Sequence, residues 1–292
     1  FNRRLVHDIA EERRLVRLVA YRLTADEVAR ALLEKARSGV RVRLIVDRAE
    51  YTNRKWPEFW LTHANIDRLW AAGVPIRQRR HAGLTHMKML VTSRWATNAS
   101  SNLADNWQRD HNYFVPASTH PAIHQAMRDR FDAMWNDAGG FEPFVPGPPD
   151  RPSLASPAPN ATAVRRLPIL TWRAAPFATG YDVYLGTTPD TMARVATVDA
   201  QLIQNPPETY SWAPPAPFEG GASFFWKVVA KTHATARDPS LVAGSATWSF
   251  RTEGRRGVAA GGGLAAGGGA APAVFRRSAG EWYILGRGGI RY

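Results

Sequence analysis

Residues 15–47 read LVRLVAYRLTADEVARALLEKARSGVRVRLIVD, and this stretch decides the fold of the first half of the chain. Its opening run, Leu15–Leu23, is mostly apolar, which is typical of a buried strand. The segment Thr24–Glu27 has the spacing of a capping box, so a helix is predicted to start there and to end at Gly39. Val40–Val46 then carries an apolar residue at every second position, as a second strand does. The order strand, helix, strand predicts an α/β domain.

Strand and helix signals keep alternating downstream of this stretch, as far as about residue 144. The expected strands are Val74–Gln78, Leu84–Thr92 and Asn112–Val115, and the expected helices are Asn65–Ala72 and Pro121–Asn136. Helices that separate strands favour parallel pairing, because a parallel neighbour needs a crossover connection. We therefore expect residues 1–142 to form an α/β/α sandwich around a mixed, mostly parallel sheet.

The composition changes after residue 142, and further segments are expected there. Residues 143–162 are predicted to be a Pro-rich linker, because proline at this density opposes a helix. Residues 163–253 hold short aromatic and β-branched runs between turn residues, which predicts an all-β, immunoglobulin-like sandwich. Residues 254–292 combine a Gly/Ala-rich segment with AVFRRSAGEWYILGRGGIRY, a sequence typical of a single β-hairpin.

The chain of 292 residues is basic and contains no cysteine: 38 Lys and Arg stand against 25 Asp and Glu, a net charge of +13. The lack of thiols excludes disulfides and thiolate metal sites, and no apolar run is long enough for a membrane-spanning helix. An apolar content of 45% excludes wholesale disorder. Residues 1–146 hold 23 basic and 16 acidic residues, a balance of +7 that suits a nucleic acid, an anionic membrane surface or a phosphorylated small molecule.

The sharpest chemical signal is the sequence THMKMLVT at Thr85–Thr92. Side chains two residues apart share one face of a strand, so His86 and Lys88 are expected to project together with Leu90, and Met89 to lie on the other face. An imidazole can attack phosphorus or transfer a proton, and a nearby ammonium can neutralise phosphoryl oxygens. The pair therefore indicates phosphoryl chemistry, although H-x-K by itself is a weak signal.

Three further stretches near this motif carry polar or basic groups. Asn98–Asn102 is a run of small polar residues suited to cradling an anion, and Asp110 stands two residues before the expected strand that begins at Asn112. The basic run Arg77–His81 has two interpretations: a rim that attracts phosphate, or a solvated edge of the sheet.

This order of motifs resembles one half of a phospholipase D superfamily domain, over roughly residues 1–137. The family carries H-x-K-x(4)-D, then G-S-x-N, then an acidic residue; His86 and Lys88 match the first motif, Ser100 and Asn102 the second, and Asp110 the acidic position. The resemblance implies a phosphodiesterase that needs no metal and no other cofactor. It also implies that His86 forms a phosphohistidine or acts as its general-acid counterpart. Lys88 and Asn102 would hold the phosphoryl oxygens, and Asp110 would orient a histidine of the neighbouring motif.

The sequence departs from the family pattern at Ser93, where the family has Asp, and at Ala99, where it has Gly. The chain also carries a single H-x-K motif, whereas the family's site needs two. The resemblance therefore implies a homodimer or an N-terminal half that precedes Phe1. Ser100 and Ser101 are expected to bind the substrate.

Our leading hypothesis is a secreted or cell-surface bacterial phosphodiesterase that acts on phospholipid head groups at a peripheral membrane surface. The alternatives are an endonuclease of the same superfamily, or a catalytically decayed binding or adhesion protein. Residues 163–253 resemble a bacterial fibronectin type III domain, which implies a spacer or adhesive unit. The tail resembles one blade of an integrin-like propeller repeat, but GGGLAAGGGAA replaces the acidic calcium loop, so no calcium site is expected.

Overall fold

The N-terminal domain is built on a seven-stranded sheet, seen in a computed structural model that describes residues 1–55, 60–103, 111–201, 206–254, 273–276 and 281–284. The sheet order is β6-β5-β4-β1-β2-β3-β7. The strands are β1 (Leu15–Ala20), β2 (Arg41–Val46), β3 (Ile76–Arg79), β4 (Lys88–Val91), β5 (Trp95–Ala99), β6 (Asn112–Pro116) and β7 (Phe141–Pro143). The helices are α1 (Asn2–Glu11), α2 (Asp26–Arg37), α3 (Arg48–Tyr51), α4 (Trp60–Ala71) and α5 (Pro121–Asn136).

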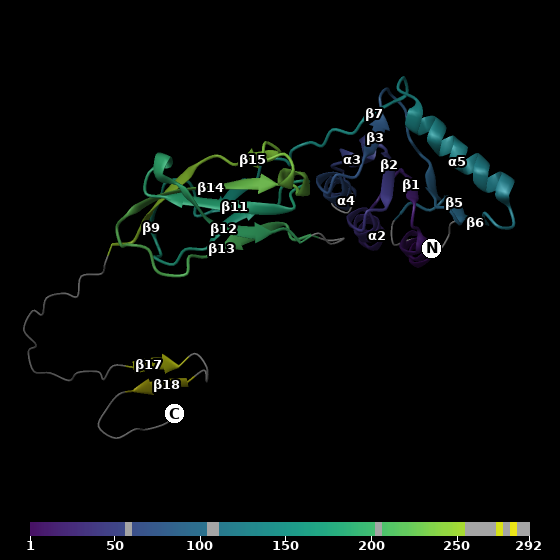
Figure 1. Cartoon of the computed structure of the whole chain (residues 1–292). Coiled ribbons are helices and arrows are strands. Elements are labelled where there is room, and N and C mark those ends of the chain that lie inside the picture. The colour runs from purple at the N-terminus through teal and green to yellow at the C-terminus, as the bar shows by residue number, and fades with distance from the viewer. Residues whose placement is uncertain (56–59, 104–110, 202–205, 255–272, 277–280, 285–292) are drawn as a thin grey trace, which may run out of the picture. The chain divides into compact units, whose positions relative to one another are not determined.

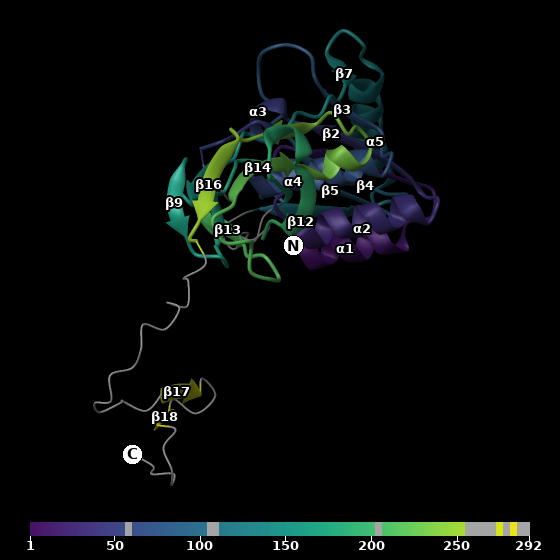
Figure 2. The same cartoon turned by 90° about the vertical axis from the view of Figure 1, so that its left-hand side faces the viewer.

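Helices cover both faces of this sheet (Figure 1). Leu18 of β1 lies in the core formed with α1, α2 and α4, whereas its neighbour Val19 packs with Phe131 and Met134 of α5. Figure 2 shows α1 and α2 side by side on the same face. Successive residues of the strand therefore pack into two different cores, one on each face of the sheet. The predicted three-layer α/β/α arrangement is confirmed.

The predicted predominance of parallel pairing is wrong. The pairs β1–β2 and β2–β3 are parallel, and the other four pairs of the sheet are antiparallel. One physical reason is β5, a strand that the sequence analysis did not predict. Only residues 92–94 connect β4 to β5, and so short a connection can join antiparallel neighbours but not parallel ones.

The start of α2 differs from the predicted capping box. The helix begins at Asp26, and the Thr24 hydroxyl donates a hydrogen bond to the carbonyl of Leu103 at 3.3 Å instead of capping it. Glu27 accepts a hydrogen bond from the side chain of Asn2 at 2.9 Å. The predicted end of the helix is confirmed, because Gly39 takes a φ of +85° that suits glycine.

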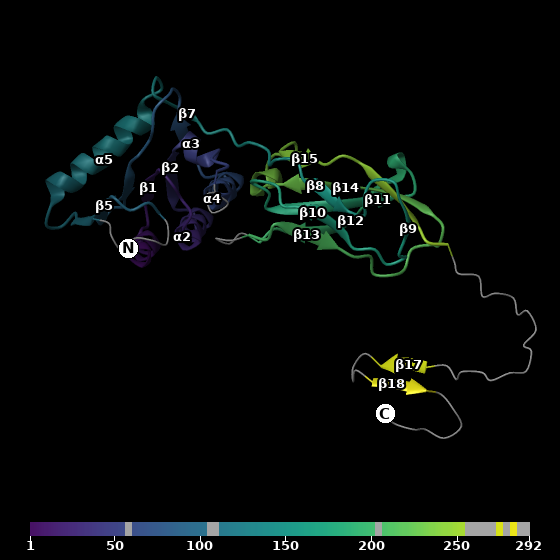
Figure 3. The ribbon, with the colours of Figure 1, turned by 180° about the vertical axis from the view of Figure 1, so that it is seen from behind.

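Residues 153–252 form a second, all-β part of the chain (Figure 3). Its strands are β8 (Ser153–Ser156), β9 (Ala161–Val164), β10 (Leu170–Arg173), β11 (Gly180–Gly186), β12 (Ala193–Asp199), β13 (Thr209–Trp212), β14 (Ser223–Lys231), β15 (Val242–Gly244) and β16 (Trp248–Thr252). The sheets β13-β10-β8 and β12-β11-β14-β16-β9 contribute to one core, in which Trp172 of β10 and Trp226 of β14 are fully buried. Strand β8 lies inside the range predicted as linker. The immunoglobulin-like and fibronectin type III assignments stay predictions.

The tail contains the predicted hairpin: β17 (Ala273–Arg276) pairs antiparallel with β18 (Glu281–Ile284). Its resemblance to a propeller blade stays a prediction. Among the described residues, no helix has both the length and the apolar character needed to cross a bilayer.

Candidate active site at the carboxyl edge of the sheet

The predicted catalytic motif lies at the edge of the sheet where the parallel strands end. Lys88, the first residue of β4, pairs with Ala20, the last residue of β1. Ala99, the last residue of β5, pairs with Asn112, the first residue of β6. The antiparallel strands β4 and β6 therefore begin at the edge where β1, β2, β3 and β5 finish. Open α/β sheets commonly carry their sites at this edge.

His86 and Lys88 form a close pair, as the sequence predicts. Lys88 Nζ lies 3.0 Å from His86 Nε2 and donates to the carbonyl oxygen of His86 at 2.9 Å. Lys88 is 4% exposed, whereas His86 is exposed. Leu90 packs in the core with α1 and α2 and Met89 in the core with α5, so the predicted assignment of strand faces is confirmed.

The contact between Lys88 and His86 indicates which nitrogen of the imidazole carries the proton. An ammonium has three donors and no acceptor, so His86 Nε2 accepts this hydrogen bond with its lone pair and the ring proton lies on Nδ1. A phosphoryl group that reached this position would meet a nucleophilic nitrogen and a cation together. The arrangement can therefore support attack on phosphorus with charge compensation.

Tyr21 contacts both members of the pair, and the sequence analysis did not single it out. Its ring meets the His86 ring at a centroid distance of 4.4 Å and an angle of 66°, and Lys88 Nζ lies 4.8 Å from its centroid. Burial, together with the negative charge of Glu50, raises the pKa of the Tyr21 phenol, so the ring stays neutral. The sequence analysis placed Tyr21 inside the expected strand Leu15–Leu23, whereas β1 ends at Ala20 and Tyr21 directly follows it at this edge.

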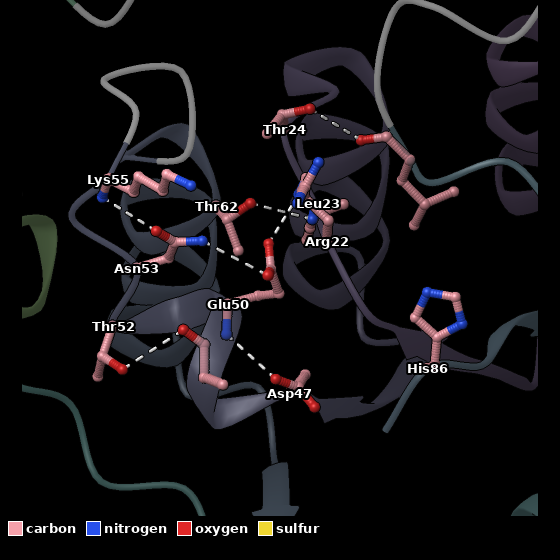
Figure 4. Close-up of polar contacts among 12 residues, drawn as sticks. Arg22, Leu23, Thr24, Asp47, Glu50, Thr52, Asn53, Lys55, Thr62 and His86 are labelled. Carbon is pink, nitrogen blue, oxygen red and sulfur yellow. Dashed lines mark hydrogen bonds and ion pairs between the residues drawn. The ribbon is translucent and has the colours of Figure 1, made fainter. Parts of the chain in front are cut away.

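Two buried carboxylates shape the loops beside the pair (Figure 4). Arg22 Nε donates to Glu50 Oε2 at 2.7 Å. Asp47, which follows β2, accepts the backbone N–H of Glu50 at 3.1 Å and that of Thr85 at 2.6 Å. Asp47 thus caps α3 and also fixes the residue before His86. Neither acidic residue was among the predicted site residues, although both follow a strand end.

The segment Asn98–Asn102, which was predicted to hold an anion, is hydrogen-bonded to the residues at the start of β6. Ser100 Oγ accepts the backbone N–H of His111 at 2.9 Å, and the Asn112 side chain donates to Ser101 Oγ at 3.4 Å. Asn102 Oδ1 is buried and has no hydrogen-bond partner among the described residues. The pairing of β5 with β4 places this segment at the same edge as Lys88. Asp110 lies outside the described residues.

The Glu12 carboxylate contacts the backbone of Ser93, the position at which the phospholipase D family pattern has Asp. Glu12 Oε1 accepts the backbone N–H groups of Arg13 and Arg14 at 2.9 and 2.6 Å, and Oε2 accepts that of Ser93. Ser93 follows β4, whereas His86 precedes it, so this contact lies at the opposite end of the strand. The carboxylate at Ser93 therefore holds the β4–β5 connection and does not take part in the phosphoryl site.

His86 also lines a pocket of about 710 Å³ between α5 and the loop that joins β3 to β4. The described part of the chain holds no group of three or more His, Asp or Glu placed to bind a metal ion.

Comparison with known proteins places this domain in a family. A family model described as "Cardiolipin synthase, PLD-like domain" matches residues 5–135. The match supports a phospholipase D-like domain in this part of the chain.

The phospholipase D-like domain is similar to the mitochondrial cardiolipin hydrolase of Chlamydomonas reinhardtii, with 25% identity over 124 residues. That match covers 42% of this chain and 52% of the relative, so the chain spans about half the length of this curated protein. Among solved structures, Nuc from Salmonella typhimurium, a phospholipase D family member, has 20% identity and a TM-score of 0.40, over 48% of this chain and 88% of Nuc. NucT from Helicobacter pylori has 16% identity and a TM-score of 0.37, over 46% of this chain and 86% of NucT.

Proposed function

We propose that the phospholipase D-like domain is a phosphodiesterase that hydrolyses the head-group phosphodiester of a phospholipid through a phosphohistidine on His86. The observation that carries the proposal is the 3.0 Å contact between Lys88 Nζ and His86 Nε2 at the carboxyl edge of the sheet. The match of residues 5–135 to a family described as cardiolipin synthase-like supports it.

The reaction follows from this pair. His86 Nε2 forms a bond to phosphorus while the bond from phosphorus to the head-group oxygen breaks, and a second histidine gives that oxygen its proton. Lys88 stabilises the negative charge on the non-bridging oxygens, together with the amide of Asn102. Water then attacks the phosphohistidine and gives a proton to the second histidine. The products are a phosphomonoester, the free head group and regenerated His86.

The second histidine belongs, in this proposal, to a second copy of the domain or to an N-terminal half of a longer protein. A homodimer is supported by the edge position of β6 and by Tyr113 on that strand, which is 66% exposed. We also propose a secreted or cell-surface location, where a phospholipid surface is the substrate.

The test is hydrolysis of phosphatidylcholine vesicles by the purified chain, with plasmid DNA as a parallel substrate. His86→Ala is expected to lower the rate of head-group release by at least about a thousandfold, because it removes the nucleophile. His7→Ala is the matched control, since His7 is an exposed histidine on α1, and should leave the rate unchanged. Lipid hydrolysis that survives His86→Ala would contradict the mechanism.

Two other outcomes would favour the alternatives. Cleavage of DNA without lipid hydrolysis, abolished by His86→Ala, would identify an endonuclease. No turnover of either substrate by a chain shown to be dimeric in sedimentation would identify a decayed binding protein.

A further inference from the structure

The pocket beside α5 has two walls that are held in place by the fold. One wall is a stripe of α5 in which Arg130, Ala133 and Met134 stand at helical spacing and face the pocket together, and Asp137, directly after the helix, extends this wall. The other wall is the loop between β3 and β4, which includes Leu84 and Met87.

Hydrogen bonds fix the shape of this loop. Arg79 Nη1 donates to the carbonyl oxygen of Leu84 at 2.9 Å, and its guanidinium lies where a side chain on Gly83 would project. Gly83 has a φ of +118°, which suits glycine. Arg77 donates to the carbonyls of Trp135 and Phe141 and so joins the end of α5 to β7. The basic run of residues 77–81 is thus in part a structural clamp around the pocket.

The charges on the walls favour an anion. Arg79, His81 and Arg130 line the pocket, and no ion pair engages Arg130 among the described residues. Asp137 also lines it, but Asp137 Oδ1 already accepts the backbone N–H groups of Gly139 and Gly140 at 3.0 and 2.9 Å. A phosphate monoester entering the pocket would therefore meet the exposed guanidinium of Arg130 and the half-buried one of Arg79, beside a carboxylate that already accepts two backbone N–H groups.

Aliphatic and thioether side chains make up much of the rest of the lining, beside Thr85, His86, Gly140 and the half-buried Phe141. Leu84, Met87 and Met134 are on the walls, and Leu84 is 54% exposed. Flexible side chains of this kind adapt to an alkyl chain, whereas single-stranded nucleic acid is held on exposed aromatic platforms. We infer that this pocket is a binding site for a phosphate-bearing amphiphile, which it holds by Arg130 and Arg79 at the phosphate and by Leu84 and Met87 along the alkyl chain.

This pocket adjoins the phosphoryl site of the proposed function at His86, which lines it, but its other wall is formed by α5. Leu90, two residues after Lys88 on β4, lies in the core with α1 and α2, whereas Met134 belongs to the core on the α5 side of the sheet and Met87 packs against that core. Binding in the pocket therefore does not require that the domain be catalytically active. A failure of the hydrolysis assay and a failure of this inference are separate results.

The test measures binding of ethyl, butyl and hexyl phosphate to the whole chain by calorimetry at low salt. Affinity should rise by about two- to fourfold for each added methylene, as expected for an alkyl chain that leaves water. Arg130→Gln should weaken hexyl phosphate binding by about tenfold, and Leu84→Ser should flatten the dependence on chain length. Both residues are exposed, so the fold is retained.

The matched control is Arg128→Gln, because Arg128 is an exposed arginine of the same helix that does not line the pocket. Arg128→Gln should change the affinity by less than twofold. Equal weakening by Arg128→Gln and Arg130→Gln would overturn the inference, because it would reveal only a nonspecific charge effect. Binding of a single-stranded oligonucleotide that depends on Arg130, without binding of hexyl phosphate, would also overturn it.

Discussion

Replacement of Glu12 by Gln is expected to destabilise the phospholipase D-like domain by about 3 kcal/mol at pH 7. Glu12 is 2% exposed, and its carboxylate accepts backbone N–H groups from Arg13, Arg14 and Ser93. An amide presents only one acceptor oxygen to these donors, so at least one partly buried N–H loses its partner, which costs about 1–3 kcal/mol. The remaining hydrogen bonds are no longer made to a charged acceptor and become weaker, which accounts for the rest of the expected destabilisation.

The effect should depend on pH in a defined direction. Burial raises the pKa of Glu12, but the hydrogen bonds from Ser93 and Arg14 outweigh burial and hold this pKa below its usual value of 4.5. The unfolded chain therefore binds more protons at Glu12 than the folded domain does. The stability from this carboxylate is complete above about pH 4.5 and is lost as the pH falls through the folded-state pKa. The difference between the wild type and Glu12→Gln should shrink accordingly between pH 7 and pH 3.

Urea denaturation followed by far-UV circular dichroism measures this difference, and 3 kcal/mol corresponds to a shift of about 1–3 M in the midpoint of the domain's transition. Glu11→Gln is the control, since the Glu11 side chain is 52% exposed and lies 3.7 Å from Arg94. Such a surface pair contributes less than about 1 kcal/mol. The reasoning is refuted if Glu12→Gln behaves like Glu11→Gln at pH 7, or if its effect is the same at both pH values.

Three further outcomes are expected. Tyr21→Leu should lower kcat/KM by about ten- to a hundredfold in the hydrolysis assay, because it removes the aromatic ring beside the His86 imidazole and the Lys88 ammonium. Tyr21→Phe keeps the ring and should stay near the wild-type value. Equal losses in the two variants would argue against this role of the ring. Asp182→Asn should destabilise the all-β part by about 1–2 kcal/mol at pH 7 in thermal unfolding, because Lys231 Nζ donates to this carboxylate at 2.7 Å. Burial raises the pKa of Asp182, but the hydrogen bond from Lys231 and the other favourable contacts outweigh burial and hold this pKa below its usual value of 3.8. The destabilisation by Asp182→Asn should therefore fade as the pH drops below about 3.8. Gly39→Ala should cost about 1 kcal/mol in urea denaturation because of its φ of +85°, and Gly147→Ala, where the added methyl group meets open space, should cost less.

Local periodicity predicted much of the fold correctly. The alternation around Lys88 assigned Leu90 and Met89 to opposite faces, and the apolar spacing gave the bounds of α5, Pro121–Asn136. These features depend on residues that are near in sequence, so the pattern by itself contains the information. The mixed sheet was predicted, but its predominance of antiparallel pairs was not, because β5 is short and carries polar residues that favoured a loop.

The sequence by itself determined the α/β class, the all-β second part and the nearness of His86 to Lys88, because residues two apart in an extended segment lie close together; the strand itself begins only at Lys88. Only the tertiary structure brought Tyr21 against that pair, set Asp47 on the backbone of Thr85, and placed Glu12 at Ser93. The residues of each of these contacts lie far apart in the chain, and the register of neighbouring strands brings them together. The energy of burying the whole sheet fixes that register, and no short stretch of sequence encodes it.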